Sequence, residues 1–373
     1  MSGVPLFDPA RQFAEAGGEV LEAVGRVLRS GRYILGEEVE HFEAELASWL
    51  GVRFVVGVAS GTDALVIALR ACGVGPGDEV ITTPFTFAAT ATAVLLAGAV
   101  PVFADISLTD FNLDPGSLEG LLSERTRAVL PVHLFGHPAP MTAICGFAQE
   151  HGLLVIEDAA QALGAELEGR KAGSWGRAAA LSFYPTKNLG GFGDGGAVAT
   201  DDPEVAGAAR LLRNHGSAGD HLHRLLGYNS RLDELQAAAL RVKLRHLPRW
   251  NEERRRAAGL YRQGLAGTGL RLPSEARGCR HAYGLYTVLA EERDSLASFL
   301  RERGIGCGVY YPRPLYRSPV FRGKSRGGPS PAAEEACCRA LSLPIFPGLR
   351  EEEVELVCGA LREWEGSRGR RGT

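Results

Sequence analysis

Short apolar runs alternate with amphipathic segments along the first two-thirds of the chain. Runs of four or five small or β-branched apolar residues, bounded by turn signals, predict buried strands. The predicted strands lie at residues 54–58, 80–83, 100–104, 128–132, 153–157, 179–183 and 197–200. Helical spacing of apolar residues occurs between them, at residues 63–71, 86–96, 115–122 and 140–151. Strands that alternate with helices predict an α/β fold with a largely parallel sheet.

The pattern changes after about residue 229. Two long helices are predicted at residues 232–247 and 250–265, followed by strands near 283–289 and 307–310 and helices near 295–303, 331–341 and 351–364. We therefore expect two domains: a large domain over residues 1–248 and a smaller C-terminal α+β domain over residues 249–373. The linker at residues 322–331, rich in Gly, Ser and basic residues, is expected to be mobile, and the tail at 366–373 is expected to fray.

Composition narrows the class of protein. The 373 residues are 45% hydrophobic and 23% charged with a net charge of −3, which argues against a disordered chain and a basic nucleic-acid-binding protein. The longest apolar region, residues 88–104, is interrupted by Thr, Gly and Pro, so no membrane span is expected. Seven cysteines without a C-x-x-C motif, and an N-terminus without a signal-peptide pattern, predict a cytoplasmic protein.

Lysine is scarce in this sequence. Of 41 basic residues other than histidine, only Lys171, Lys187, Lys243 and Lys324 are lysines, so few primary amines are available for chemistry. Lys187 follows a predicted strand in a turn that contains Pro185 and leads into a glycine-rich run. A lysine in such a cramped turn can act as a nucleophilic amine when burial lowers its pKa. The ordinary alternative is a surface lysine on a loop.

Two other strand ends carry polar groups that suit the same chemistry. Asp158 ends a buried apolar strand, where α/β sheets bind ligands, although it could simply cap a helix. Residues 59–63 join a strand to a helix, and small residues with free amides at a helix N-terminus bind phosphate well; an ordinary capped helix is the alternative. A phosphate cradle, an acid and a lysine are what pyridoxal 5′-phosphate requires.

Other motifs favour no additional site. Residues 191–196 match G-x-G-x-x-G but lead into a strand instead of opening a helix, so a dinucleotide site is not expected. His221 and His223 have no Cys partner nearby in the sequence, so no metal site is expected. His133, which follows an apolar strand, is expected to be a buried, hydrogen-bonded histidine near the site.

The motifs together resemble the fold-type I, pyridoxal-phosphate-dependent sugar aminotransferases of the DegT/DnrJ/EryC1/StrS family. The similarity runs from about Arg32 to Pro344. It is carried by residues 75–81, 84–87, 157–161, 185–190, 193–196 and 229–233. The resemblance implies a large domain with a mostly parallel mixed sheet flanked by helices, followed by a smaller α+β domain.

The resemblance also implies residue roles. Lys187 would hold the cofactor as a Schiff base, Asp158 would pair with the pyridinium nitrogen, and Gln161 would hydrogen-bond the ring hydroxyl. The remaining implied cofactor contacts are stacking by Phe87, phosphate binding by the Gly61 and Thr62 backbone and Ser182, and a phosphate contact by Asn229 from a neighbouring subunit. This last role implies a homodimer with shared active sites. Five polar or aromatic residues in motif-like segments are candidate substrate contacts: Tyr33, Tyr184, His215, Tyr310 and Tyr311.

The implied reaction moves an amino group from L-glutamate to a nucleotide-linked keto-deoxysugar, with pyridoxamine 5′-phosphate formed in turnover. A 3-keto sugar linked to dTDP is preferred; a 4-keto sugar and a UDP or GDP carrier are the alternatives. Lys187 favours transamination, because family members with His at this position act as dehydratases. Three other interpretations remain: a dehydratase or glycine-cleaving lyase of the same fold, a regulatory protein that reuses the fold, which would have lost the lysine or the acid, and a nucleotide-dependent dehydrogenase.

Overall fold

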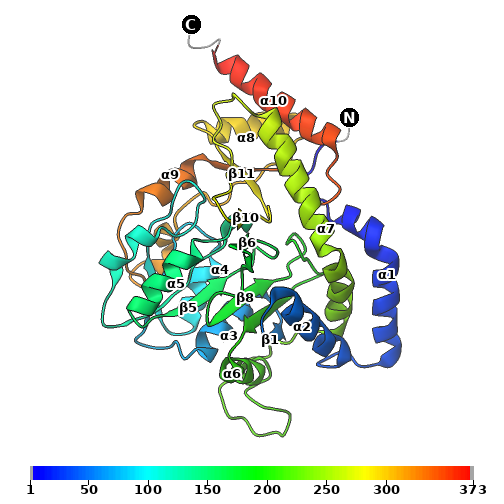
Figure 1. The fold of residues 1–373 in the computed structure, drawn as a ribbon, viewed down its shortest axis with the longest axis vertical. Coiled ribbons are helices and arrows are strands. Elements are labelled where there is room, and N and C mark those ends of the chain that lie inside the picture. Colours follow the sequence, from blue (N-terminus) through cyan, green and yellow to red (C-terminus); the bar gives the residue numbers. More distant parts are fainter. Residues whose placement is uncertain (1–2, 370–373) are drawn as a thin grey trace.

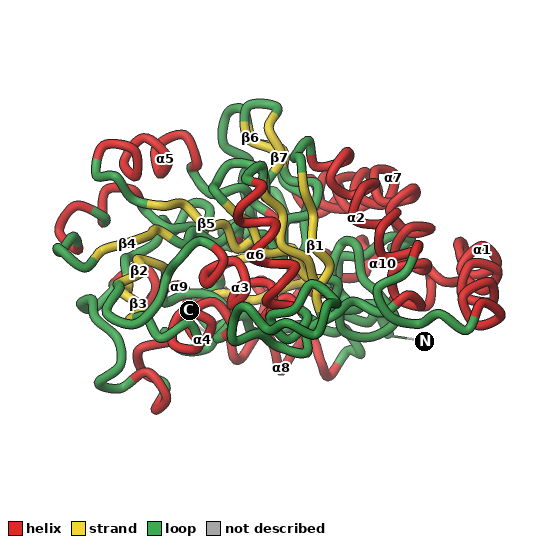
Figure 2. The backbone as a smooth tube through the Cα atoms, turned by 90° about the horizontal axis from the view of Figure 1, so that it is seen from below, coloured by secondary structure: helices red, strands yellow, loops and turns green. Residues whose placement is uncertain are grey.

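The central feature of the protein is a seven-stranded sheet, seen in a computed structural model that describes residues 3–369. Its strands are β1 (Phe54–Val58), β2 (Glu79–Thr82), β3 (Val100–Phe103), β4 (Thr126–Val129), β5 (Leu154–Asp158), β8 (Ala178–Ser182) and β9 (Gly196–Thr200). The order across the sheet is β1-β9-β8-β5-β4-β2-β3. Figure 2 shows β1 and β3 at opposite ends of the sheet, with β5, β4 and β2 between them. Strand β9 is antiparallel to both neighbours, and the other pairs are parallel. The predicted α/β fold with a mostly parallel sheet is confirmed.

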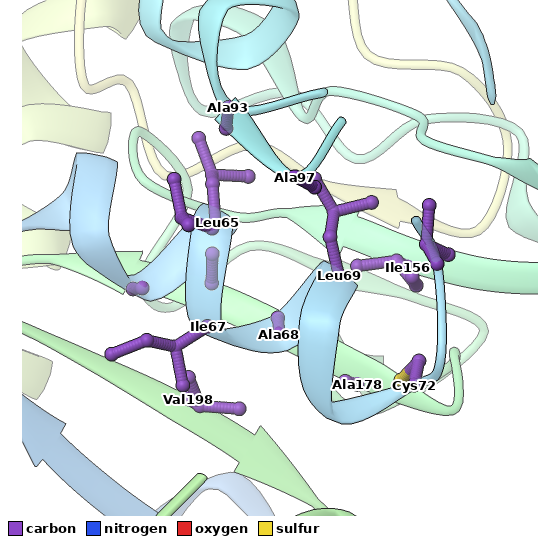
Figure 3. Close-up of a cluster of buried hydrophobic side chains, with 14 of the residues drawn as sticks. Leu65, Ile67, Ala68, Leu69, Cys72, Ala93, Ala97, Ile156, Ala178 and Val198 are labelled. Atoms are coloured by element: carbon purple, nitrogen blue, oxygen red, sulfur yellow. The ribbon is translucent and has the colours of Figure 1, made fainter. Parts of the chain in front are cut away.

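Helices cover both faces of this sheet, which is why its strands are apolar along their whole length. One face packs against α3 (Gly61–Ala71), α4 (Ala89–Leu96) and α6 (Pro203–Arg213). Figure 3 shows Leu65, Ile67 and Leu69 of α3 among side chains of the strands and of α4. The other face packs against α2 (Glu37–Leu50), α5 (Met141–Glu150) and α7.

Helix α7 (Glu234–Gly264) is a single helix of 31 residues, so the predicted division into two helices is wrong. Pro248 lies inside it and removes one main-chain donor, but buried contacts on both sides, including Leu247 and Trp250, keep the helix continuous. The expected domain boundary between residues 248 and 249 falls inside this helix, and the two-domain division stays a prediction. In Figure 1, α7 leads from the central sheet to the C-terminal elements, and α1 (Pro9–Ser30) packs beside it.

The C-terminal part contains a two-stranded antiparallel sheet of β11 (Tyr286–Leu289) and β12 (Ala340–Leu343). Three helices surround it: α8 (Arg293–Glu302), α9 (Pro331–Arg339) and α10 (Glu351–Gly369). The predicted strand at 307–310 is wrong, since only Gly308 forms an isolated bridge, to Ser342. A third small sheet joins β6 (Glu166–Leu167), β7 (Arg170–Lys171) and β10 (Cys279–Arg280).

The predicted helix at 115–122 is also wrong. Two short 3₁₀ helices, Pro115–Ser117 and Glu119–Leu121, take its place. Gly116 and Gly120 weaken the helical preference of this segment, which explains the difference. Helices α1 and α2 were not predicted.

The linker at 322–331 runs along the edge of the main sheet. The Arg326 amide donates to the Pro101 carbonyl at 2.9 Å, and the Phe103 amide donates to the Arg326 carbonyl at 2.9 Å. This pairing covers the outer edge of β3, which no other strand of the sheet pairs with. Helix α10 continues past residue 364 to Gly369, and residues 370–373 of the predicted frayed tail lie outside the described residues. Within residues 3–369, none of the helices is long and apolar enough to span a bilayer.

A buried carboxylate joins α7 to α2. The Glu234 side chain, 3% exposed, accepts hydrogen bonds from the amides of Gly36, Glu38 and Val39 at 2.8, 2.9 and 3.0 Å. These are the amides at the start of α2, which have no partners within their own helix. One side chain from the first turn of α7 therefore fixes the beginning of a helix almost 200 residues earlier.

We predict that Glu234→Ala lowers the free energy of unfolding by about 2–3 kcal/mol, because it leaves three buried or part-buried amides without an acceptor. Glu37→Ala, which removes an exposed carboxylate from the same helical turn, should change it by less than about 0.5 kcal/mol. Urea denaturation followed by circular dichroism compares the two variants. Equal effects would contradict the capping role of Glu234.

Candidate active site

Most of the predicted cofactor-binding residues meet at one edge of the main sheet. Strands β1, β2, β4, β5 and β8 run in the same direction, so their carboxyl ends lie along the same edge. Asp158 and Ser182 are the last residues of β5 and β8, and Ser60 and Gly61 follow β1. Ligands of α/β proteins bind at this edge.

Lys187 lies in the turn that follows β8 and is half-buried. Its amide donates to the Tyr184 carbonyl at 2.8 Å, which closes the turn. Burial lowers the pKa of the Lys187 amine to about 8, and the negative charge of Asp158 opposes this shift. A substantial fraction of the amine is therefore neutral near physiological pH, as a nucleophile or proton acceptor requires.

Asp158 is buried, and its oxygens have specific partners. The Thr90 hydroxyl donates to Oδ2 at 2.8 Å, and the Ala160 amide donates to Oδ1 at 3.2 Å. Burial raises the pKa of the Asp158 carboxyl, and these two hydrogen bonds act in the opposite direction. Thr90 comes from the start of α4 and was not predicted, although a threonine inside an otherwise apolar helical segment is a signal that could have identified it.

The start of α3 lies against the end of β8. A Cβ atom on Gly61 would lie only 2.6 Å from Cβ of Ser182, so only glycine permits this approach. The Ser60 hydroxyl caps the helix by accepting from the Asp63 amide at 3.1 Å. The amides of the first turn, including those of Gly61 and Thr62, and the Ser182 hydroxyl thus lie together at a helix N-terminus, an arrangement that suits an anion.

Gln161 connects this edge to the C-terminal part of the chain. Its Oε1 accepts from the Phe135 amide at 2.9 Å, and its Nε2 donates to the Tyr311 hydroxyl at 3.0 Å. Burial raises the pKa of the Tyr311 hydroxyl, and the Gln161 hydrogen bond opposes this. The ring of Phe87, 58% exposed, lies 6.3 Å from the Tyr311 ring, centroid to centroid. The partnership of Gln161 and Tyr311, 150 residues apart, was not predicted.

The remaining candidate residues lie in two places. Tyr184 and Tyr310 are close enough for Tyr184 to contribute, after burial, to the raised pKa of Tyr310. Tyr33 and His215 have other partners: the Tyr33 hydroxyl donates to the Leu28 carbonyl at 3.3 Å, and the His215 carbonyl accepts from His223. Asn229 is exposed and forms a bridge with Asn214 on the same surface.

His133 and Glu157 form a buried, hydrogen-bonded pair next to the strand end that carries Asp158. The two side chains are fully buried, with 2.8 Å between His133 Nε2 and Glu157 Oε2. His133 Nδ1 accepts from the Ala139 amide, so Nε2 carries the proton that Glu157 accepts. Glu157 also accepts from the amides of Gly173, Trp175 and Gly176. The prediction of a buried, hydrogen-bonded His133 is confirmed.

The other motifs have structural roles of their own. Gly196 begins strand β9, so the glycine run leads into a strand, as the sequence indicated. His223 Nδ1 donates to the His215 carbonyl at 2.8 Å. Within the described residues, no cluster of three or more His, Cys, Asp or Glu side chains is arranged to hold a metal ion.

The side chains at this edge fit pyridoxal 5′-phosphate. Its phosphate matches the first-turn amides of α3 and Ser182, its aldehyde matches the Lys187 amine, and its ring nitrogen matches the Asp158 carboxylate. A buried carboxylate with a raised pKa gains most from a cationic N–H donor, which a protonated ring nitrogen is. The donor set of this chain therefore suits this cofactor.

Comparisons with known proteins agree with this chemistry. The sequence profile of the DegT/DnrJ/EryC1/StrS aminotransferase family matches residues 15–362. A curated protein of Streptomyces venezuelae, named dTDP-3-amino-3,4,6-trideoxy-alpha-D-glucose transaminase, is 48% identical over 363 residues, which cover 97% of this chain and 96% of that protein. A protein of Geobacillus stearothermophilus, named pleiotropic regulatory protein, is 48% identical over 365 residues, with coverage of 97% and 98%.

A solved structure is similar over nearly the whole length. The crystal structure of DesV from S. venezuelae, determined with a reaction intermediate, has a TM-score of 0.95 and 48% sequence identity. The matched region covers 98% of this chain and 99% of that chain. Fold type I, expected from the sequence, is thereby confirmed.

The lowered pKa of Lys187 leads to a prediction for the cofactor-free protein. Since only the neutral amine reacts with an acylating reagent, its acylation should rise with pH through a midpoint near 8, with about a tenth of the full rate at pH 7. Peptide mass spectrometry after brief labelling measures this rate, with exposed Lys324 as the internal control for reagent concentration. A midpoint near the ordinary lysine value of about 10.4 would contradict the burial of the amine.

Proposed function

Because the chain belongs to the DegT/DnrJ/EryC1/StrS aminotransferase family, we propose that it is a pyridoxal-phosphate-dependent aminotransferase that moves an amino group from L-glutamate to a nucleotide-linked keto-deoxysugar. The observation that carries this proposal is the meeting of Lys187, Asp158 and the start of α3 at one edge of the sheet. Bound pyridoxal phosphate would supply an aldehyde that accepts the amino group and a ring that withdraws electrons.

Lys187 acts as both anchor and proton carrier in this proposal. Its Nζ would bind the cofactor aldehyde at rest. With the amino donor in place, the Lys187 amine would take the proton from the donor Cα and, once protonated, later give a proton to the acceptor carbon, as a general acid–base. A pKa near 8 suits both directions, because neither the neutral nor the protonated amine is rare at physiological pH.

Asp158 and its neighbours maintain the charge that the chemistry needs. The carboxylate stabilises a protonated ring nitrogen, and Thr90 fixes Oδ2 by its hydrogen bond. The first-turn amides of α3 with Ser182 bind the phosphate, and the exposed Phe87 ring offers a face for stacking. Gln161 Nε2 has a second N–H, beyond the one it donates to Tyr311, for the ring hydroxyl.

The acceptor is proposed to be a 3-keto sugar carried by dTDP. The 48% identical relative from S. venezuelae supports this choice, because its name specifies a dTDP-linked 3-amino sugar. The proposed sugar contacts of this chain are Tyr184, which begins the lysine turn, and its neighbour Tyr310. A 4-keto sugar or a UDP carrier is the alternative within the same reaction.

A regulatory function is the second candidate, because the relative from G. stearothermophilus carries a regulatory name. A protein that had kept only the fold would have no need for a lysine of lowered pKa beside a buried acid. This chain retains Lys187, Asp158 and the Thr90 hydrogen bond. These features favour the enzyme.

A homodimer with shared active sites is part of the proposal. Large apolar side chains are exposed on α1 and on the loop that follows α6: Leu21, Leu28, Leu222 and Leu226. In the proposed dimer, these exposed apolar side chains lie in the contact between the subunits. Asn229, exposed on the same loop, would then reach the phosphate site of the neighbouring subunit. A cytoplasmic location is proposed as well, since all seven cysteines are free thiols.

The direct test of the reaction incubates the cofactor-loaded protein with L-glutamate and a panel of 3-keto and 4-keto sugars linked to dTDP, UDP or GDP. We expect an amino sugar and 2-oxoglutarate in equal amounts, with the dTDP-linked 3-keto sugar preferred. Lys187→Ala should abolish turnover and the visible absorbance of lysine-bound cofactor, and Lys187→Arg should lower turnover by more than about 100-fold although its charge is retained. Near-normal turnover in Lys187→Ala would overturn the assignment.

Subunit mixing tests the shared site. Lys187→Ala and a second, impaired variant, Asn229→Leu, are refolded together, so that half of the dimers are mixed. Each mixed dimer then regains one intact site, and the mixture should reach about a quarter of the wild-type activity. No recovery, or a monomer in light scattering, would show that the sites are not shared.

A further inference from the structure

Asn188, the residue after Lys187, is almost completely buried, with 2% of its surface exposed. Its side-chain Nδ2 donates to two different parts of the molecule. One hydrogen bond reaches Asn251 Oδ1 of α7 at 2.7 Å, and the other reaches the Ala282 carbonyl at 2.9 Å. Both N–H groups of the amide are thus used to hold the lysine turn.

Asn251 extends this connection toward the cofactor side of the sheet edge. Its own Nδ2 donates to the Leu163 carbonyl at 3.1 Å. Leu163 lies two residues after Gln161, in the loop that follows Asp158. A chain of two buried amides therefore links the Lys187 turn, through α7, to the loop that carries Gln161.

The segment around Ala282 also links the Lys187 turn to the loop that carries Gln161. The Ala282 amide donates to the Gly136 carbonyl at 2.8 Å, and the Leu285 amide donates to the Phe135 carbonyl at 3.0 Å. Gly284 packs so closely that a Cβ atom there would lie 2.6 Å from the Gln161 carbonyl oxygen and 3.2 Å from Asn188 Oδ1. The lysine turn and the glutamine loop thus share the same backbone support.

We propose that Asn188 is a positioning residue for amino transfer, which fixes the Lys187 turn relative to the Gln161 loop. The inference rests on the proposed function, because it gives this geometry a catalytic purpose. Lys187 Nζ must reach the donor carbon while the cofactor ring is held by Asp158 and Gln161. A turn that shifts relative to that loop misdirects the amine, and a misplacement of about 1 Å can cost 10²-fold in rate.

The control must remove a comparable hydrogen bond that does not touch the lysine turn. Tyr261 of α7 is fully buried, and its hydroxyl donates to the Pro344 carbonyl at 2.9 Å. Tyr261→Phe therefore removes one buried hydrogen bond between α7 and the C-terminal part. Its effect on stability serves as the reference for a merely structural change.

Asn188→Ala should lower kcat by about 10- to 100-fold with the KM for glutamate within about 3-fold of wild type. Its bound cofactor should also be lost faster on dialysis, and its visible absorbance should titrate at a different pH. Tyr261→Phe should keep kcat, absorbance and cofactor retention within about 2-fold of wild type. If Asn188→Ala matches Tyr261→Phe in all three, the positioning role is wrong.

Asn251→Ala provides the second variant, because it removes the acceptor of one Asn188 hydrogen bond and the donor to the Leu163 carbonyl without altering the turn itself. It should shift kcat and the absorbance titration in the same direction as Asn188→Ala but by less. If Asn188→Ala fails to fold, Asn251→Ala takes its place in the comparison. A wild-type kcat and a wild-type absorbance titration in Asn251→Ala would then overturn the proposal. In the double variant the two effects should add to less than their sum, because both substitutions remove the same Asn188–Asn251 hydrogen bond.

The experiment separates two kinds of failure. A wild-type protein that transfers no amino group from glutamate contradicts the proposed function, whatever the variants show. An active wild-type protein whose turnover and cofactor absorbance are unaffected by Asn188→Ala contradicts only the role of Asn188.

Discussion

The parallel direction of β1, β2, β4, β5 and β8 is the constraint on which the candidate site depends. Parallel strands place their carboxyl ends along one edge of the sheet. Residues that follow different strands therefore become neighbours in space although they are far apart in the sequence. Asp158 comes from β5, Ser182 and Lys187 from β8 and its turn, and Gly61 from the helix after β1. The apolar packing on both faces of the sheet, visible for one face in Figure 3, fixes that edge.

Buried polar groups then set the chemistry of this edge. Burial moves the pKa of Lys187 down and that of Asp158 up, which favours a neutral amine and a carboxyl group in need of a cationic partner. Hydrogen bonds from Thr90 and Ala160 keep the carboxylate oriented against the cost of its burial. The low-dielectric surroundings destabilise an unpaired charge on either group. They therefore favour binding of a cofactor that reacts with the Lys187 amine and pairs with the Asp158 carboxylate.

Local sequence patterns predicted the groups that belong to strand ends, because a strand, a short turn and a glycine are all local signals. The sequence-based predictions were wrong or missing where packing between distant segments determines the structure. Helix α7 stays continuous across Pro248 because its buried contacts outweigh the lost hydrogen bond. The partnership of Gln161 with Tyr311 and that of Asn188 with Asn251 join residues 150 and 63 positions apart, which no local pattern encodes.

The most direct measurement is a single half-reaction without any sugar. Cofactor-loaded protein is mixed with L-glutamate, and 2-oxoglutarate and the form of the cofactor are quantified. With L-glutamate in large excess, we expect one equivalent of 2-oxoglutarate per bound cofactor, with conversion of that cofactor to pyridoxamine phosphate. Glutamate binding without 2-oxoglutarate formation would contradict the claim that Lys187 and Asp158 form the centre of an aminotransferase.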